Sequence, residues 1–85
     1  MDLKPYRDQI NEIDQEIIRQ LARRKELSRK IGELKSLHQA EVHDLKREAE
    51  LKALRAELAE ALGLDPQEIE PIFQAILSWS HKLQS

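Results

Sequence analysis

Two basic residues interrupt the apolar pattern of the first half of the sequence. Arg24 lies seven residues from both Ile17 and Ile31, in a series whose apolar members recur at steps of three and four. Lys35 follows Arg24 by eleven residues, which at about 100° per residue returns it to within roughly 20° of the same helical direction. Cations on a buried face are costly unless an anion meets them. The spacing therefore indicates a local anion site.

Asp44, Arg47 and Glu48 form a second charged group. Their spacing places them side by side on a helix that starts near Asp44, and the same face turns apolar from Leu51 onward. Asp44 and Glu48 could act as a general acid and base pair. We favour another role, in which they cap the helix and orient a substrate hydroxyl or a neighbouring arginine.

Ser80 and Gln84 bring polar groups to the apolar stripe of the last segment. Ser80 follows Phe73 by seven residues, and Gln84 follows Ser80 by four. In one interpretation, long basic side chains lay their stems on the core and send their charges to water or to nearby acids. In the other, forked guanidinium groups and neutral donors enclose a small dicarboxylate. For any one of these residues the first interpretation is favoured. Taken together, however, Arg7, Arg24, Lys35 and Arg47 with Ser80 and Gln84 are harder to dismiss as surface charges, and the second interpretation would place them around one closed pocket.

Other site chemistries lack the residues that they need. The sequence has no cysteine, which excludes disulfides, thiolate nucleophiles and cysteine-bound metals. His38 and His43 lie across an expected loop, and neither they nor His81 have the spacing of a zinc motif. The serines lack a Ser/His/Asp pattern. We expect no metal, no cofactor and no covalent nucleophile.

The composition is typical of one small helical domain, residues 1–85. Of the 85 residues, 40% are hydrophobic and 35% are charged, and Gly and Pro are scarce. The net charge of -2 and the pI near 5.9 provide no basic surface for nucleic acid or an anionic membrane. No segment has the apolar length of a signal sequence or a membrane span. We expect a cytoplasmic protein that binds neither nucleic acid nor membrane.

The first helix is expected to be long. It runs from about Tyr6 to Ser36, with Pro5 suited to its first turn. Gly32 inside it either permits close approach of a neighbour or is tolerated at a small cost. Residues 37–43 lose the apolar rhythm, and we place the first connection there.

Two shorter helices follow. Asp44 caps the second helix, which ends at Gly63. Asp65 and Pro66 then supply an N-cap and a proline at the first helical position of the third helix.

These lengths predict an intertwined homodimer. At about 1.5 Å per residue the first helix spans about 45 Å, whereas the others are each below about 30 Å and cannot cover its whole apolar stripe. A chain of 85 residues is also near the size at which too little apolar surface is buried. We expect an all-α fold in which the long helices of two chains pair and their N-terminal residues reach the partner's core.

In order and spacing, these segments resemble the all-helical AroQ class of chorismate mutases, including the mutase domains at the N-termini of bifunctional aromatic-biosynthesis enzymes. The resemblance covers nearly the whole chain without insertions. It is carried by residues 6–14 (YRDQINEID), 21–27 (LARRKEL) and 42–48 (VHDLKRE), together with Lys35, Ser80 and Gln84.

The resemblance implies a homodimer that rearranges chorismate to prephenate in the biosynthesis of phenylalanine and tyrosine. It implies that Arg24 and Lys35 bind the carboxylates of chorismate, and that Arg7 arrives from the other subunit. Arg47 would support this basic wall, and Ser80 would assist at a carboxylate.

The remaining implied roles concern the ring and the breaking bond. Asp44 and Glu48 would hold the ring hydroxyl, while Lys35 and Gln84 would donate to the ether oxygen. Negative charge grows on that oxygen as the bond lengthens, so these donors would bind the transition state more strongly than the substrate.

Two other functions stay open at this stage. One is a structural or adaptor dimer whose inward charges only fix the register of its helices. The other is a non-catalytic relative that binds the ligand without converting it.

Overall fold

The computed structural model describes residues 2–37 and 45–84, and within them the chain is helical. Helix α1 spans Lys4–Leu37, α2 spans Leu45–Ala61 and α3 spans Pro66–Gln84. The expectation of one long and two shorter helices is confirmed. The prediction that the first connection begins at Leu37 is wrong, because Leu37 is the last residue of α1. The rest of the predicted connection and the Asp44 cap lie outside the described residues.

Helix α1 begins two residues earlier than predicted because Asp2 caps it. The backbone N–H of Lys4 donates to Asp2 Oδ1 at 2.9 Å, and the N–H of Arg7 donates to the carbonyl of Leu3 at 3.0 Å. Pro5 lies in the first turn, where its missing donor costs nothing. The 34 residues of the helix give it a length of about 51 Å.

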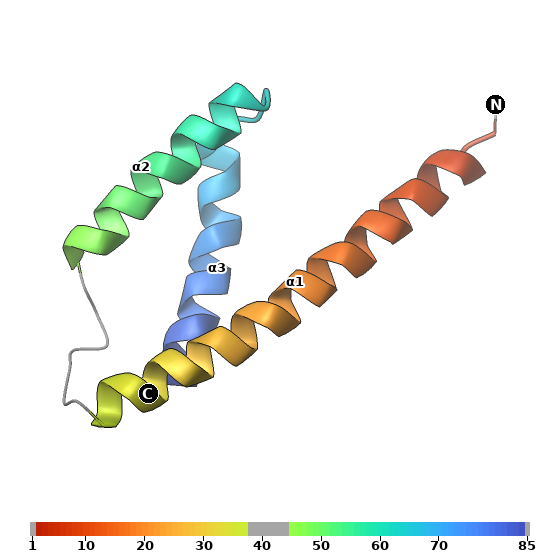
Figure 1. Cartoon of the computed structure of the whole chain (residues 1–85). Coiled ribbons are helices and arrows are strands. Elements are labelled where there is room, and N and C mark those ends of the chain that lie inside the picture. The colour runs from red at the N-terminus through yellow and green to blue at the C-terminus, as the bar shows by residue number, and fades with distance from the viewer. Residues whose placement is uncertain (1, 38–44, 85) are drawn as a thin grey trace.

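The turn between α2 and α3 follows the predicted signals. Gly63 adopts a φ of 77°, and the N–H of Leu64 donates to the carbonyl of Ala59 at 2.8 Å, which closes the end of α2. Asp65 Oδ1 accepts from the N–H of Gln67 at 2.9 Å and so caps α3. This turn reverses the chain so that α2 and α3 form a helical hairpin (Figure 1).

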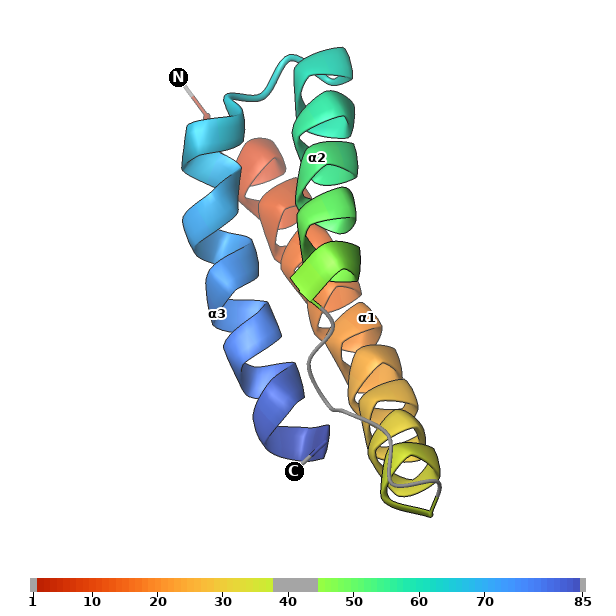
Figure 2. The same ribbon diagram turned by 90° about the vertical axis from the view of Figure 1, so that its left-hand side faces the viewer.

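Helix α3 is the central element of the chain. It packs against α2 along the hairpin (Figure 2) and against the C-terminal half of α1. The described parts of α1 and α2 make no close backbone contact and lie apart in Figure 1, so α3 is the helix that connects them.

A polar cluster ties α2 to α3 midway along the hairpin. Arg55 Nη2 lies 3.3 Å from Glu70 Oε1, and the guanidinium carbon of Arg55 lies 5.0 Å from the centroid of the Phe73 ring. Gln74 Nε2 donates to the same Glu70 oxygen at 2.8 Å. The Gln74 hydrogen bond, followed by the charge of Arg55, lowers the pKa of Glu70.

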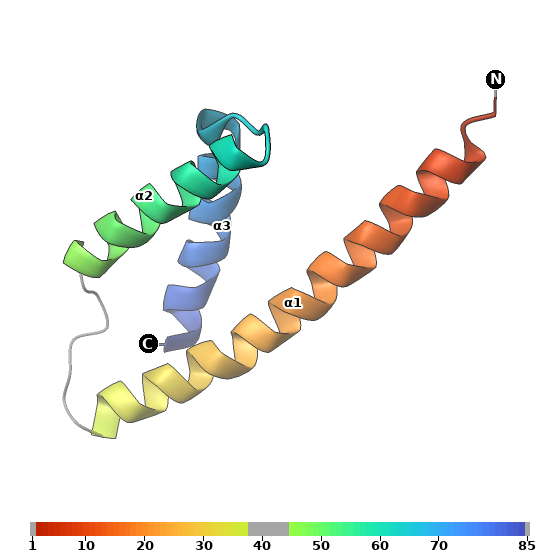
Figure 3. The same ribbon diagram turned by 45° about the horizontal axis from the view of Figure 1, so that its top comes forward.

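One chain leaves most of its large apolar side chains exposed. Ala59 is the buried hydrophobic residue among the positions that the structure describes. Ile10, Ile13 and Ile17 are each more than half exposed, on a part of α1 that projects beyond the hairpin (Figures 1 and 3). No helix within the two described ranges is apolar enough over a sufficient length to cross a bilayer.

We predict that Glu70→Gln lowers the stability of the fold at neutral pH and has no effect at low pH. A carboxylate with a lowered pKa stabilises the folded state fully above its unfolded pKa, about 4.3. This contribution is lost as the pH falls through the lower folded value. Thermal unfolding at pH 7 and at pH 3 measures the difference, and an equal deficit at both pH values would contradict the assignment.

Candidate active site

Helices α1 and α2 are separated, and this leaves a groove between them that α3 also lines. The groove has a volume of about 1070 Å³. Every helix contributes to its lining. From α1 come Arg24, Leu27, Ser28, Ile31 and Lys35; from α2, Leu45, Arg47, Glu48 and Leu51; and from α3, Leu77, Ser80, His81 and Gln84.

Arg24 and Ser80 meet on the wall between α1 and α3. Ser80 is buried, and its Oγ accepts a long hydrogen bond of 3.5 Å from Arg24 Nη2. Arg24 Nε is also buried and finds no partner within the part of the chain that the structure describes. A buried guanidinium donor without an acceptor is costly. Because Arg24 also lines the groove, its guanidinium group is suited to pairing with an incoming anion.

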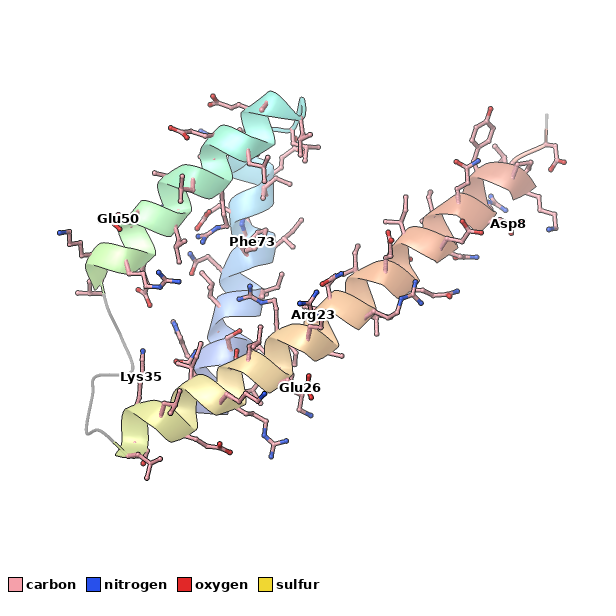
Figure 4. The ribbon with its side chains drawn as sticks, in the orientation of Figure 1. Asp8, Arg23, Glu26, Lys35, Glu50 and Phe73 are labelled. Atoms are coloured by element: carbon pink, nitrogen blue, oxygen red, sulfur yellow. The ribbon has the colours of Figure 1, made fainter. Side chains whose placement is uncertain are left out.

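Gly32 allows the last turn of α3 to lie directly on α1. A Cβ at this position would lie 2.8 Å from both Cα and the carbonyl oxygen of Gln84, closer than real side chains approach. The first of the two roles considered for Gly32 is therefore confirmed. Because Lys35 is one helical turn beyond Gly32, Lys35 and Gln84 approach the groove at the same end. Figure 4 shows the Lys35 side chain directed to the side of α1 on which α2 lies.

Helix α2 supplies both signs of charge to the opposite wall. Arg47 and Glu48 line the groove there, and Glu48 Oε1 lies 3.2 Å from His81 Nε2 on α3. The groove thus combines the cations Arg24, Lys35 and Arg47 with a carboxylate held beside an imidazole. Such a site can bind a small anion with more than one negative group and can also accept a hydrogen bond from it.

Comparison with known proteins decides the family. Residues 6–85 match the model of the family described as chorismate mutase type II. The chain belongs to this family. The match covers nearly the whole sequence, so the resemblance found from the sequence segments is confirmed.

Two curated proteins are similar in sequence to this member of the chorismate mutase family. The chain is 36% identical over 80 residues to the T-protein of Enterobacter agglomerans, across 94% of the chain and 21% of that relative. It is 39% identical over 80 residues to the bifunctional chorismate mutase/prephenate dehydratase of Aquifex aeolicus, across 91% of the chain and 22% of the relative. The chain therefore spans about a fifth of the length of these curated relatives.

The structure gathers most of the predicted site residues into this groove. Six of them line it together, namely Arg24, Lys35, Arg47, Glu48, Ser80 and Gln84. Arg7 does not, because it lies 17 residues before Arg24 on the same helix, which separates the two by about 25 Å. Asp44 lies outside the described residues.

Sequence reasoning missed two polar residues of the groove, Ser28 and His81. Ser28 is buried one turn from Arg24 and one turn from Gly32, and the stripe of small residues that it shares with Gly32 was a usable signal for close helix packing. His81 was considered only as a metal ligand, since its contact with Glu48 depends on how α2 and α3 pack. Among the residues described here, no three acidic or histidine side chains are grouped as a metal site.

We predict that Gly32→Ala destabilises the protein even though alanine favours a helix. The added methyl group would force the last turn of α3 away from α1, and overpacking of this kind costs about 1 to 3 kcal/mol. The gain in helix propensity is only about 0.5 to 1 kcal/mol. Chemical denaturation measures the balance, with Ser36→Ala as the exposed control on the same helix. A Gly32→Ala variant that is more stable than the parent would contradict the close approach.

Proposed function

We propose that this chain is a chorismate mutase that converts chorismate to prephenate in the groove, with a second copy of the chain completing the site. The family assignment supports the reaction, and the gathering of Arg24, Lys35 and Arg47 around one groove is the observation that carries the position of the site. The name of the Aquifex relative includes the same reaction. We place the reaction in aromatic amino acid biosynthesis, in a single cytoplasmic domain.

The two carboxylates of chorismate match the cations of the groove. Arg24, held beside Ser80, provides forked donors for one carboxylate. Lys35 and Arg47 supply positive charge farther along the groove. Fixing both carboxylates holds the enolpyruvyl arm over the ring, which is the conformer that reacts.

The reaction breaks the ether C–O bond as a new C–C bond forms, with no proton transfer and no covalent intermediate. Negative charge develops on the ether oxygen while this happens. Lys35 and Gln84 share one end of the groove and would donate hydrogen bonds to that oxygen. Their contribution grows toward the transition state, so it lowers the barrier rather than only strengthening binding.

The acidic side of the groove orients the ring. Glu48 would accept a hydrogen bond from the ring hydroxyl, and we assign Asp44 to the same task. Neither residue is needed as an acid or base, because the rearrangement moves no proton to the protein.

The second copy supplies what one chain lacks. Arg7 is about 25 Å along α1 from Arg24, so it cannot reach the groove of its own chain. The exposed isoleucines of the same projecting segment provide the apolar surface for pairing. An intertwined homodimer would bury these side chains and carry Arg7 to the partner's groove.

The purified chain should consume chorismate, followed by the loss of its absorbance, and yield prephenate. Ligand binding without conversion would favour the non-catalytic relative, and neither binding nor conversion would favour the adaptor.

Lys35→Ala should lower turnover about a hundredfold or more, since it removes one donor to the ether oxygen. Lys30→Ala, on the exposed side of α1, is the matched control. Near-normal turnover in the Lys35→Ala protein would refute the role of Lys35.

Mixing two inactive variants tests whether sites are shared between chains. We predict that Arg7→Ala and Lys35→Ala chains, refolded together in equal amounts, recover about a quarter of normal activity. Half of the dimers would then be mixed, each with one intact site of two. Arg24→Ala mixed with Lys35→Ala should recover nothing, because these two residues belong to the same chain's groove. If the two mixtures recovered the same activity, Arg7 would not be contributed to the site by the partner chain.

A further inference from the structure

The contact between His81 and Glu48 is not used by the mechanism above. His81 Nε2 lies 3.2 Å from Glu48 Oε1, and the side chains are 29% and 36% exposed respectively. The pair joins α3 to α2 and forms part of the wall between the groove and a smaller adjoining pocket of about 300 Å³. It is therefore within the site and not on the outer surface.

We infer that His81 is a positioning residue that holds the Glu48 carboxylate for the hydroxyl group of the substrate. With a proton on Nε2, the imidazole donates to Glu48 Oε1 and so fixes the orientation of the carboxylate, which has the capacity to accept a further hydrogen bond from the ligand. This inference rests on the proposed function, because it takes the ring hydroxyl of chorismate as the group that Glu48 receives.

The His81 imidazole also has an electrostatic effect on the charge that Glu48 presents to the substrate. Glu48 places a negative charge in a groove that is to receive a dianion, so the carboxylate repels the substrate that it orients. A donor on Glu48 draws part of this charge away from the ligand. Several cations also line this region, namely Arg47, Lys52 and Arg55 from α2 and Arg24 and Lys35 from α1, and they add to the attraction of the groove for an anion.

A purely structural role for His81 predicts different behaviour. The hairpin is already fastened by the Gly63 turn and by the contact of Arg55 with Glu70. Loss of the His81 donor should therefore affect substrate affinity more than folding. Loss of a packing residue would instead lower stability and leave the Michaelis constant of the folded protein unchanged.

The test compares His81→Leu, His81→Gln, Glu48→Ala and the double variant Glu48→Ala/His81→Leu in steady-state kinetics with chorismate. Because both side chains are partly exposed, removing the hydrogen bond should have the effect of an ordinary one and raise KM about threefold to tenfold in His81→Leu, with kcat changed less than KM. His81→Gln restores a neutral N–H donor and should recover most of the loss. In the Glu48→Ala background, His81→Leu should have no further effect, because its partner is gone.

Gln67→Ala, at an exposed position of α3 that lines neither the groove nor the adjoining pocket, is the control and should leave both constants unchanged. An unaltered chain that does not convert chorismate would overturn the proposed function and the inference together. A converting chain in which His81→Leu leaves KM unchanged, or raises it equally with and without Glu48, would overturn the inference alone. Should His81→Leu not fold, His81→Ala takes its place with the same expected pattern.

Discussion

The close contact of α3 with α1 at Gly32 is the constraint on which the groove depends. Without a side chain at Gly32, the backbone of Gln84 can lie against α1. This contact sets the position of Ser80 one turn earlier, beside Arg24. Because the hairpin turn at Gly63 fixes α2 to α3, one contact of small groups on α1 determines where residues from all the described helices meet.

The same arrangement leaves the single chain without a substantial core. Helix α3 can cover only part of a helix that is about 51 Å long, and the isoleucines of the projecting segment stay exposed. The missing core and the distance of Arg7 from the groove of its own chain are two aspects of one geometry, since the segment that lacks cover is also the segment that carries Arg7. In the proposed dimer, folding and completion of the site would occur together, so the stability and the activity would both depend on chain concentration.

The sequence alone predicts the features that local chemistry determines, such as helix ends and the faces of single helices. Asp65, Pro66 and Gly63 mark the α2–α3 turn because caps and left-handed positions demand particular residues. Arg24 and Lys35, which line the groove, could be singled out because helical periodicity places both on an apolar face. The pairing of His81 with Glu48 was not predictable, because it depends on the rotation of α3 relative to α2, and no spacing along one chain records that rotation.

The central claim, that a second chain completes the groove, is tested most directly by measuring mass and activity in the same diluted samples. Sedimentation should give a species of twice 9.9 kDa at high concentration. Chorismate conversion per chain should fall in step with dissociation on dilution. A fully active species with the mass of one chain would contradict the account.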